Sequence, residues 1–233
     1  MLDTFSEKHV VVTGGTGALG TAVVRQLIKE GAHCHIPCYS QGELDRFDLR
    51  DHERVNLIPD INLTNEDSAQ TFYASLPSLW ASFHVAGGFA MDPVTETTLA
   101  SFMRMLQLNV VTAFLSSREA VRVIRRSEGQ GRIVNIAARP AIQATAGMVA
   151  YATSKAAVAS MTQHMAEELA PEGIYVNAIL PSIMDTPANR ESMPGADHTL
   201  WPKVAEVADA IIQLGSPTNI LTNGALVPVY GRS

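Results

Sequence analysis

The sequence contains only two cysteines, Cys34 and Cys38, and their spacing does not suit a disulfide. If both lie on one strand, four residues at about 3.3 Å each hold them roughly 13 Å apart, which is too far for a disulfide. The cysteines and histidines also lack the spacing of metal ligands, so no metal site is expected. We expect two thiols in or near the core of a protein that works in the reducing cytoplasm.

An excess of positive charge is also absent. The 17 Lys and Arg residues are outnumbered by 23 Asp and Glu residues, which gives a formal net charge of −6. A nucleic-acid partner requires a basic surface that neutralises phosphates, and this composition offers none. No apolar run approaches the roughly 18–20 residues that cross a bilayer, and the first residues do not form a signal peptide. The sequence therefore predicts neither a nucleic-acid partner nor a membrane partner.

The chain does contain enough apolar sequence for a large core, because 46% of its 233 residues are hydrophobic and 17% are charged. Short β-branched runs alternate with helical patterns, and no shift in composition marks a linker. This alternation predicts a single α/β domain over residues 1–233, with a doubly wound parallel sheet of about seven strands and helices on both faces. The expected strands are His9–Thr13, His33–Cys38, Val55–Pro59, Trp80–Ala86, Arg132–Ala137, Tyr175–Leu180 and Ala225–Val229, and the expected helices are Thr21–Glu30, Thr97–Arg126, Ala150–Ala170 and Val204–Leu214.

A long irregular segment follows the sixth expected strand. Residues 181–202 are rich in Pro, Met and Asp and show no regular periodicity. A loop of about 20 residues in a compact domain is more often functional than a simple connection. We therefore expect these residues to form a loop on the substrate side of the protein.

The first expected strand leads directly into the glycine-rich segment TGGTGALG. Glycines let the backbone turn tightly and approach a pyrophosphate, which then lies at the positive end of the following helix. Because the segment lies between a strand and an amphipathic helix, it predicts a dinucleotide site of the Rossmann type. The residues expected there are Gly14, Gly15, Thr16, Gly17, Ala18, Leu19 and Gly20.

A second signal lies at the start of the helix expected at Ala150–Ala170. Tyr151 and Lys155 are four residues apart, so a helix presents both side chains on one face. A tyrosine normally titrates near pH 10, and a neighbouring ammonium favours its phenolate form. Alone, such a pair usually lies on the surface of a helix and has no catalytic role. Downstream of a dinucleotide loop, it indicates an acid–base pair.

The chain resembles the short-chain dehydrogenase/reductase family in the order of five segments: TGGTGALG, LQLNVVTAF, RIVNIA, YATSK and VNAILP. The resemblance covers essentially the whole chain. It implies a nicotinamide-dependent oxidoreductase of small molecules that assembles as a homodimer or homotetramer through its two long helices. Tyr151 would donate the proton, Lys155 would bind the nicotinamide ribose and lower the tyrosine pKa, and Asn109 would hold a relay water. Further cofactor contacts implied by the resemblance are Asn62, Ala86, Gly87, Pro181, Ile183 and Thr186.

Three departures from the family pattern affect the cofactor site. Ala18 replaces the middle glycine of the phosphate loop, and Gly17 precedes it. The motif N-N-A-G reads His84-Val85-Ala86-Gly87, and the glycine after Pro181 is replaced by Ser182. The first change predicts that the loop contact shifts by one residue.

The fourth departure concerns the substrate. Thirteen residues before Tyr151, where many relatives place a serine that hydrogen-bonds a substrate carbonyl, the chain has Ala138, preceded by Ala137. A donor of this kind contributes about 3–4 kcal/mol to a transition state. The chain is therefore expected to be weak on ketones, to use another donor such as the Asn135 amide, or to take a substrate that does not need one.

Dihydropteridine reductases are short-chain relatives that also carry alanine at this position. The segments Asp185–Trp201, Ala86–Phe89 and TAGMVAYATSK resemble theirs. This resemblance implies a quinonoid dihydropterin, a conjugated imine, with Phe89, Ala138 and Met193 near the substrate. The alternatives are a generic carbonyl reductase that retains this loop, and a protein that senses NAD(P) without turnover.

The choice of cofactor depends on the end of the second expected strand, Pro37-Cys38-Tyr39-Ser40. The acidic residue that usually binds the adenosine ribose hydroxyls is absent, which removes a repulsion against a 2′-phosphate. No arginine stands directly beside the strand end, but Ser40 can hydrogen-bond a phosphate and Arg46 follows. We expect a slight preference for NADP(H) over NAD(H).

Overall fold

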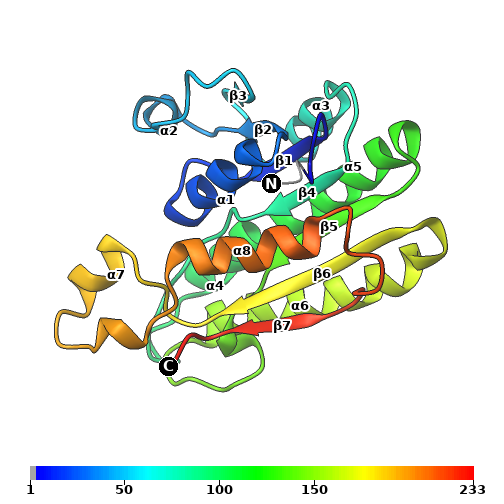
Figure 1. Cartoon of the computed structure of the whole chain (residues 1–233). Helices are drawn as coiled ribbons and strands as arrows, with labels where there is room; N and C mark the ends of the chain where they lie inside the picture. The colour runs from blue at the N-terminus through cyan, green and yellow to red at the C-terminus, as the bar shows by residue number, and fades with distance from the viewer. Residues whose placement is uncertain (1–3) are drawn as a thin grey trace.

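The computed structural model describes residues 4–233 and contains one parallel sheet between two layers of helices (Figure 1). Within these residues, seven strands lie in the order β3-β2-β1-β4-β5-β6-β7, and all neighbours are parallel. The expected fold class is confirmed. The chain changes direction across the sheet between β1 and β4, and open α/β sheets bind ligands at such a switch point. The strands are β1 His9–Thr13, β2 His33–Pro37, β3 Val55–Ile58, β4 Ala81–His84, β5 Gly131–Ile136, β6 Ile174–Pro181 and β7 Leu226–Val229.

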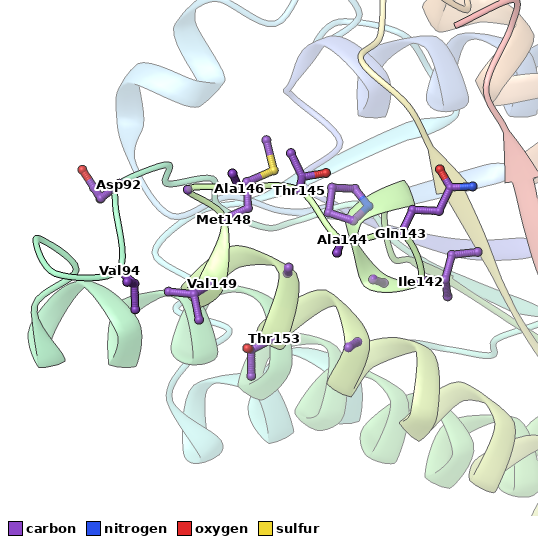
Figure 2. Close-up of a pocket in the computed structure, with 15 residues that line it drawn as sticks. Asp92, Val94, Ile142, Gln143, Ala144, Thr145, Ala146, Met148, Val149 and Thr153 are labelled. Carbon is purple, nitrogen blue, oxygen red and sulfur yellow. The ribbon is translucent and has the colours of Figure 1, made fainter.

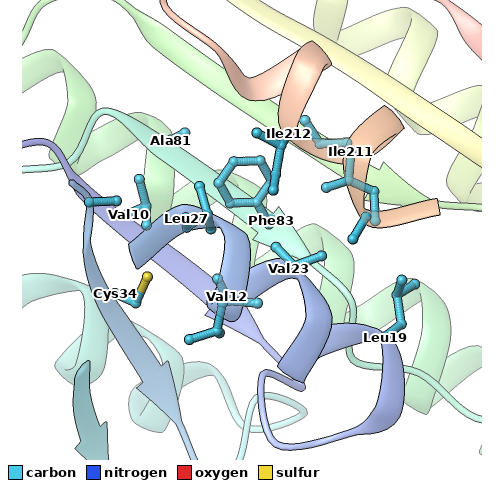
Figure 3. Packing of buried hydrophobic residues seen from close by; sticks show 14 of the residues in the cluster. Val10, Val12, Leu19, Val23, Leu27, Cys34, Ala81, Phe83, Ile211 and Ile212 are labelled. Atoms are coloured by element: carbon cyan, nitrogen blue, oxygen red, sulfur yellow. The ribbon is translucent and has the colours of Figure 1, made fainter. Parts of the chain in front are cut away.

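Alternate residues of β1 face opposite sides of the sheet. Val10 and Val12 pack in one core with α1 (Ala18–Lys29) and α8 (Val204–Gly215), and Figure 3 shows this core from close by. Val11 packs in the other core. Because strand side chains alternate with a period of two, a continuous apolar run is what a strand covered on both faces requires.

The second face is covered by α3 (Glu66–Ala74), α5 (Thr112–Ser127) and α6 (Val149–Leu169). A short helix, α4 (Leu99–Met105), joins α5 through a π-helical turn at Leu106–Val111. Turns of this kind widen a helix by one residue and are frequent at functional sites. This wider turn carries Asn109, and the sequence pattern of one long helix did not reveal it.

The helical stretch Leu99–Ser127 is long and apolar enough to cross a membrane by length and composition, although no uninterrupted apolar run in the sequence predicts it. Core helices of globular proteins meet the same criterion. Its α5 part packs against α3 and β4 and carries Arg118, Glu119 and Arg122, which form ion pairs. We therefore describe the stretch as a core helix of the α/β fold.

Several local expectations were wrong. The helices α2 (Gln41–Asp45) and α3 form where the sequence pattern predicts no helix, and residues 181–202 contain α7 (Pro187–Ser192) and a 3-10 turn. These helices are short and mostly exposed, so their apolar periodicity is weak; capping residues such as Asn65 were the better signal. Helix α1 starts three residues before the expected Thr21, because the glycine-rich segment itself supplies its first turn.

Candidate active site

The glycine-rich segment forms a tight turn between β1 and α1. Gly14 adopts a φ of +64°, and a Cβ on it would lie 2.8 Å from the backbone nitrogen of Ala86, which follows β4. A Cβ on Gly20 would lie 2.1 Å from the carbonyl oxygen of Gly14. Contacts this short exclude any side chain. Glycine at position 14 lets the turn approach the backbone after β4, and glycine at position 20 brings the start of α1 against the end of β1.

Helix α1 begins at Ala18, with Gly17 as its N-cap, and no side chain of the described residues caps it. The N–H groups of its first turn therefore have no side-chain acceptor, and the helix dipole favours an anion in front of them. Ala18, where the family pattern has glycine, is exposed there, and Thr16 is partly exposed. Such a turn is of the kind that holds the pyrophosphate of a dinucleotide, and the site at residues 14–20 stays a prediction.

The turn after β4 lies directly against Asn109. The Asn109 side chain accepts a hydrogen bond from the Gly88 nitrogen at 2.9 Å and donates to the Gly88 carbonyl at 3.0 Å and to Ser154 Oγ at 2.9 Å. A Cβ on Gly87 would lie 2.5 Å from Asn109 Oδ1 and 3.4 Å from Lys155 Nζ. Asn109 is 1% exposed, so its amide ties the β4 turn to α6 and leaves room for Lys155.

Tyr151 and Lys155 lie on the same side of α6, and the Lys155 ammonium is 5.9 Å from the centre of the tyrosine ring. Lys155 donates a hydrogen bond to the Ile136 carbonyl at the end of β5, at 2.7 Å. Phe89 meets the Tyr151 ring edge to face, with ring centres 5.0 Å apart, and is 61% exposed. The structure thus brings together the expected acid–base pair, Asn109 and the aromatic residue expected near the substrate.

The electrostatics of this pair differ from the expectation. Burial raises the pKa of Tyr151 to about 12, because the phenolate loses its hydration. Burial likewise lowers the pKa of Lys155 to about 8. The expected lowering of the tyrosine pKa is therefore not seen in the chain by itself, because burial is the cause that acts on the hydroxyl.

The remaining residues expected at the nicotinamide end follow β6. Pro181 is the last residue of that strand, and Ile183 is 42% exposed beyond it. Thr186 is 8% exposed and caps α7, accepting a hydrogen bond from the Asn189 nitrogen at 3.2 Å. Met193 ends α7. We refer to residues 182–202 as the lid.

The family model described as short chain dehydrogenase matches residues 8–197, and it contains the glycine turn, Asn109, Tyr151 and Lys155. The chain belongs to the short-chain dehydrogenase family. It is an NAD(P)-dependent oxidoreductase, which sets aside the alternative of a sensor without turnover.

Two curated relatives extend along nearly the whole chain. One is a cis-4-hydroxycyclohexanecarboxylate dehydrogenase of Sinomonas cyclohexanicum, 30% identical, with 99% of this chain and 98% of that protein covered. Another is a dihydropteridine reductase of Dictyostelium discoideum, 29% identical, with 97% and 96% covered. A solved structure titled "ElxO with NADP Bound" superposes with a TM-score of 0.88 at 21% identity and covers 97% of this chain and 98% of that one, which supports the fold. The resemblance to dihydropteridine reductases is thereby confirmed.

The two residues that follow β5, Ala137 and Ala138, carry no hydroxyl. Ala138 is 4% exposed. The Asn135 amide, the other candidate donor, is fully buried inside the sheet; its Nδ2 donates to Thr162 Oγ1 at 2.9 Å and its Oδ1 lies 2.8 Å from His84 Nδ1. Asn135 is therefore not the missing donor. His84, which replaces an asparagine of the family pattern, joins this internal network instead.

The adenosine end contains a carboxylate that sequence reasoning missed. Glu43 on α2 accepts a hydrogen bond from the Tyr39 nitrogen at 2.8 Å, just beyond β2. Ser40, the expected phosphate contact, is exposed at the start of the same helix. The spacing of Ser40 and Glu43 matches the S-x-x-E capping signature, which was the available signal. Asn62, on the neighbouring loop, accepts hydrogen bonds from the nitrogen and hydroxyl of Thr64.

A separate pocket of about 600 Å³ lies between the loop after β5 and the start of α6 (Figure 2). It is enclosed by Asp92, Val94, the loop at residues 140–149 and the side of α6 that carries Thr153. Neither Tyr151 nor Lys155 lines it within residues 4–233. The pocket therefore borders the loop that follows Ala138 but is not the proposed reaction site. Among residues 4–233, no group of three or more His, Cys, Asp or Glu side chains is placed to hold a metal ion.

Proposed function

We propose that this dehydrogenase reduces a small-molecule carbonyl or conjugated imine, with Tyr151 as the proton donor. The proposal depends mainly on one observation: Tyr151 and Lys155 share one side of α6, beside the glycine turn of β4 and Asn109. The nicotinamide would supply the hydride. The Tyr151 hydroxyl would supply the proton, and its raised pKa of about 12 keeps it protonated at neutral pH, which is the form that reduction requires.

The cofactor contacts follow from the same arrangement. The backbone from Gly14 to Gly20 would hold the pyrophosphate at the start of α1. Lys155 would bind the nicotinamide ribose, while Pro181, Ile183 and Thr186 would border the nicotinamide at the start of the lid. Ala86 and Gly87 would contact the cofactor through their backbone, because Ala86 lies against Gly14 and Gly87 lies against Asn109. Asn62 would lie near the adenine.

For the substrate, the absence of a hydroxyl at Ala138 favours a quinonoid dihydropterin. When a ketone accepts hydride, negative charge develops on its oxygen and a hydrogen-bond donor stabilises it. A conjugated imine has no such oxygen at the reacting centre and does not need that donor. The exposed ring of Phe89, held edge to face on Tyr151, offers a surface for a flat heterocycle. The Dictyostelium relative is a dihydropteridine reductase, whereas the Sinomonas relative supports the carbonyl alternative.

The experiment follows NAD(P)H oxidation with a panel of ketones and with a chemically generated quinonoid dihydropterin, for the natural chain and for Ala138→Ser. A pterin reductase should turn over the dihydropterin, and the added hydroxyl should raise ketone reduction by at least about 10-fold, since one donor contributes a few kcal/mol. Dihydropterin reduction should stay level or fall.

Ala137→Ser is the matched control, because Ala137 is buried among Ala159, Ala178 and Leu180 rather than facing the site. A chain that reduces ketones well and gains nothing from Ala138→Ser is a carbonyl reductase with another donor. No turnover of either class would overturn the proposed substrates.

We also propose a slight preference for NADPH over NADH. The carboxylate of Glu43 would weaken this preference. This carboxylate lies at the strand end where a 2′-phosphate would carry negative charge. We expect Glu43→Gln to raise the ratio of NADPH to NADH affinity by at least about 5-fold, because two like charges near a protein surface repel by about 1 kcal/mol or more. Calorimetric titration with both cofactors measures this ratio. Asp45→Asn, on the same helix but bonded to Gln41, should leave it unchanged; an unchanged ratio in Glu43→Gln would refute the role of Glu43.

We also propose a cytoplasmic homodimer or homotetramer. Leu99, Met103 and Phe114 on α4 and α5 expose 77%, 46% and 46% of their surface, and Val149 on α6 exposes 41%. Apolar side chains at this density on neighbouring helices are typical of subunit contacts. A monomeric mass in solution at micromolar concentration would contradict the assembly. Cys34 and Cys38 are buried free thiols, as suits a reducing compartment.

A further inference from the structure

The lid is attached to the rest of the protein at both of its ends by one short segment, residues 230–233, which follow β7. At the first end, Ser182 Oγ donates a hydrogen bond to the Tyr230 carbonyl at 2.9 Å and accepts one from Ser233 Oγ at 2.8 Å. At the second end, the Arg232 nitrogen donates to the Leu200 carbonyl at 2.9 Å. In Figure 1 the end of the red chain lies beside the orange lid segment.

Gly231 makes this double attachment possible. Its φ is +64°, and a Cβ on it would lie 2.8 Å from both the Leu200 carbonyl oxygen and the Pro202 nitrogen. The backbone at Gly231 thus packs directly on the second end of the lid. That end is in turn joined to the first, because the Asp185 nitrogen donates to the Pro202 carbonyl at 2.9 Å.

Tyr230 connects the same segment to the residues that follow β5. Its ring packs against the apolar cluster that contains Ala137, and the guanidinium of Arg139 lies 4.9 Å from the ring centre. Ala137 and Arg139 flank Ala138, the residue that we place near the substrate. One segment therefore contacts both ends of the lid and the loop that starts at Ala138.

We propose that residues 230–233 are a clasp that positions the lid over the substrate site, and that Gly231 is its essential positioning residue. The proposal builds on the proposed function, since the lid carries Thr186 and Met193. The clasp is proposed to act on the lid rather than on cofactor or substrate. It acts by holding the lid backbone, so its loss should loosen the lid in the free protein, before any ligand binds.

The test compares Gly231→Ala with Gly129→Ala. Gly129 also has a positive φ, +70°, but nothing among the described residues lies within 4 Å of a Cβ built there. Both variants thus carry the same backbone strain, and only Gly231→Ala pushes against the lid. The primary measurement is hydrogen exchange in peptides that cover residues 182–202, without ligand.

We expect lid exchange in Gly231→Ala to be at least about 5-fold faster, the equivalent of losing roughly one net hydrogen bond, and unchanged in Gly129→Ala. Once a substrate is known, its KM should rise in Gly231→Ala more than kcat falls. Equal lid exchange in the two variants would overturn the clasp proposal. Because hydrogen exchange is measured without substrate, this result can be told apart from a failure of the proposed function. If Gly231→Ala does not fold, Ser182→Ala removes the first attachment alone and should accelerate the same peptides; no acceleration would likewise overturn the proposal.

Discussion

Replacing Tyr151 with Phe should lower turnover by at least about 100-fold, the low end for loss of a general acid. The substitution keeps the ring, so the edge-to-face contact with Phe89 at 5.0 Å survives and only the hydroxyl is lost. The residues at the end of β5 do not replace it, because Ala138 has no hydroxyl and Asn135 is fully buried. Steady-state kinetics with the best substrate of the panel measure the effect, and NAD(P)H affinity should change little.

Tyr175→Phe is the matched control. Tyr175 lies on β6, and its hydroxyl donates a hydrogen bond to the Ile220 carbonyl, away from the glycine turn. Its loss should leave turnover unchanged. Full activity in Tyr151→Phe would refute the proton-donor role and leave the fold untouched; it would indicate a substrate that takes hydride alone and draws its proton from water.

Lys155→Met should weaken NAD(P)H binding by at least about 10-fold, because a hydrogen bond from a charged donor is worth about 1.5–3 kcal/mol. Methionine fills a similar volume without the ammonium. Turnover should fall as well, since one side chain is proposed to bind the ribose and to stand beside Tyr151. Fluorescence titration gives the affinity. Lys29→Met removes the same charge from the exposed end of α1 and should have no effect.

The pH dependence of binding provides a second readout of Lys155. Burial lowers its pKa to about 8, below the value of an exposed lysine, so the ammonium is charged below pH 8 and neutral above it. Cofactor affinity of the natural protein should therefore decline as the pH rises through about 8. In Lys155→Met this decline should be absent. A flat profile in the natural protein would show that the charge of Lys155 does not contribute to binding.

Thermal unfolding separates a binding role from a structural one. A buried ammonium that hydrogen-bonds a carbonyl, here Ile136, gains little stability because desolvation offsets the bond. The Tm of Lys155→Met at pH 7 should therefore match or exceed that of the natural protein. A marked drop in Tm would indicate that Lys155 mainly supports the fold.

The main elements of the fold were predictable because they follow from local patterns. The three valines of HVVVT predict a strand covered on both faces, and Val10 and Val11 indeed lie in different cores. The glycines of the first turn were equally readable, since only glycine tolerates the contacts at Gly14 and Gly20. The short helices were harder to predict, because α2 buries no residue and α3 has only nine residues, three of them buried.

The candidate site was predicted in part. The i, i+4 spacing of Tyr151 and Lys155 holds for any helix, and the structure places both side chains on one side of α6. Local spacing did not predict what surrounds them. The amide of Asn109 reaches the Gly88 backbone from a π-helical turn, and the Glu43 carboxylate folds back onto the end of β2.

The sequence by itself determined the order of the main strands and helices along the chain, the glycine-rich turn after β1 and the spacing of Tyr151 and Lys155. These features depend on contacts within a few residues. Only the tertiary structure decided the ionisation of Tyr151, since its pKa depends on how much water the packed chain excludes. The tertiary structure also decided how the lid is held, because the Arg232 nitrogen and the Leu200 carbonyl come from segments that meet only when β7 joins the sheet beside β6. Local periodicity does not encode such distant pairings.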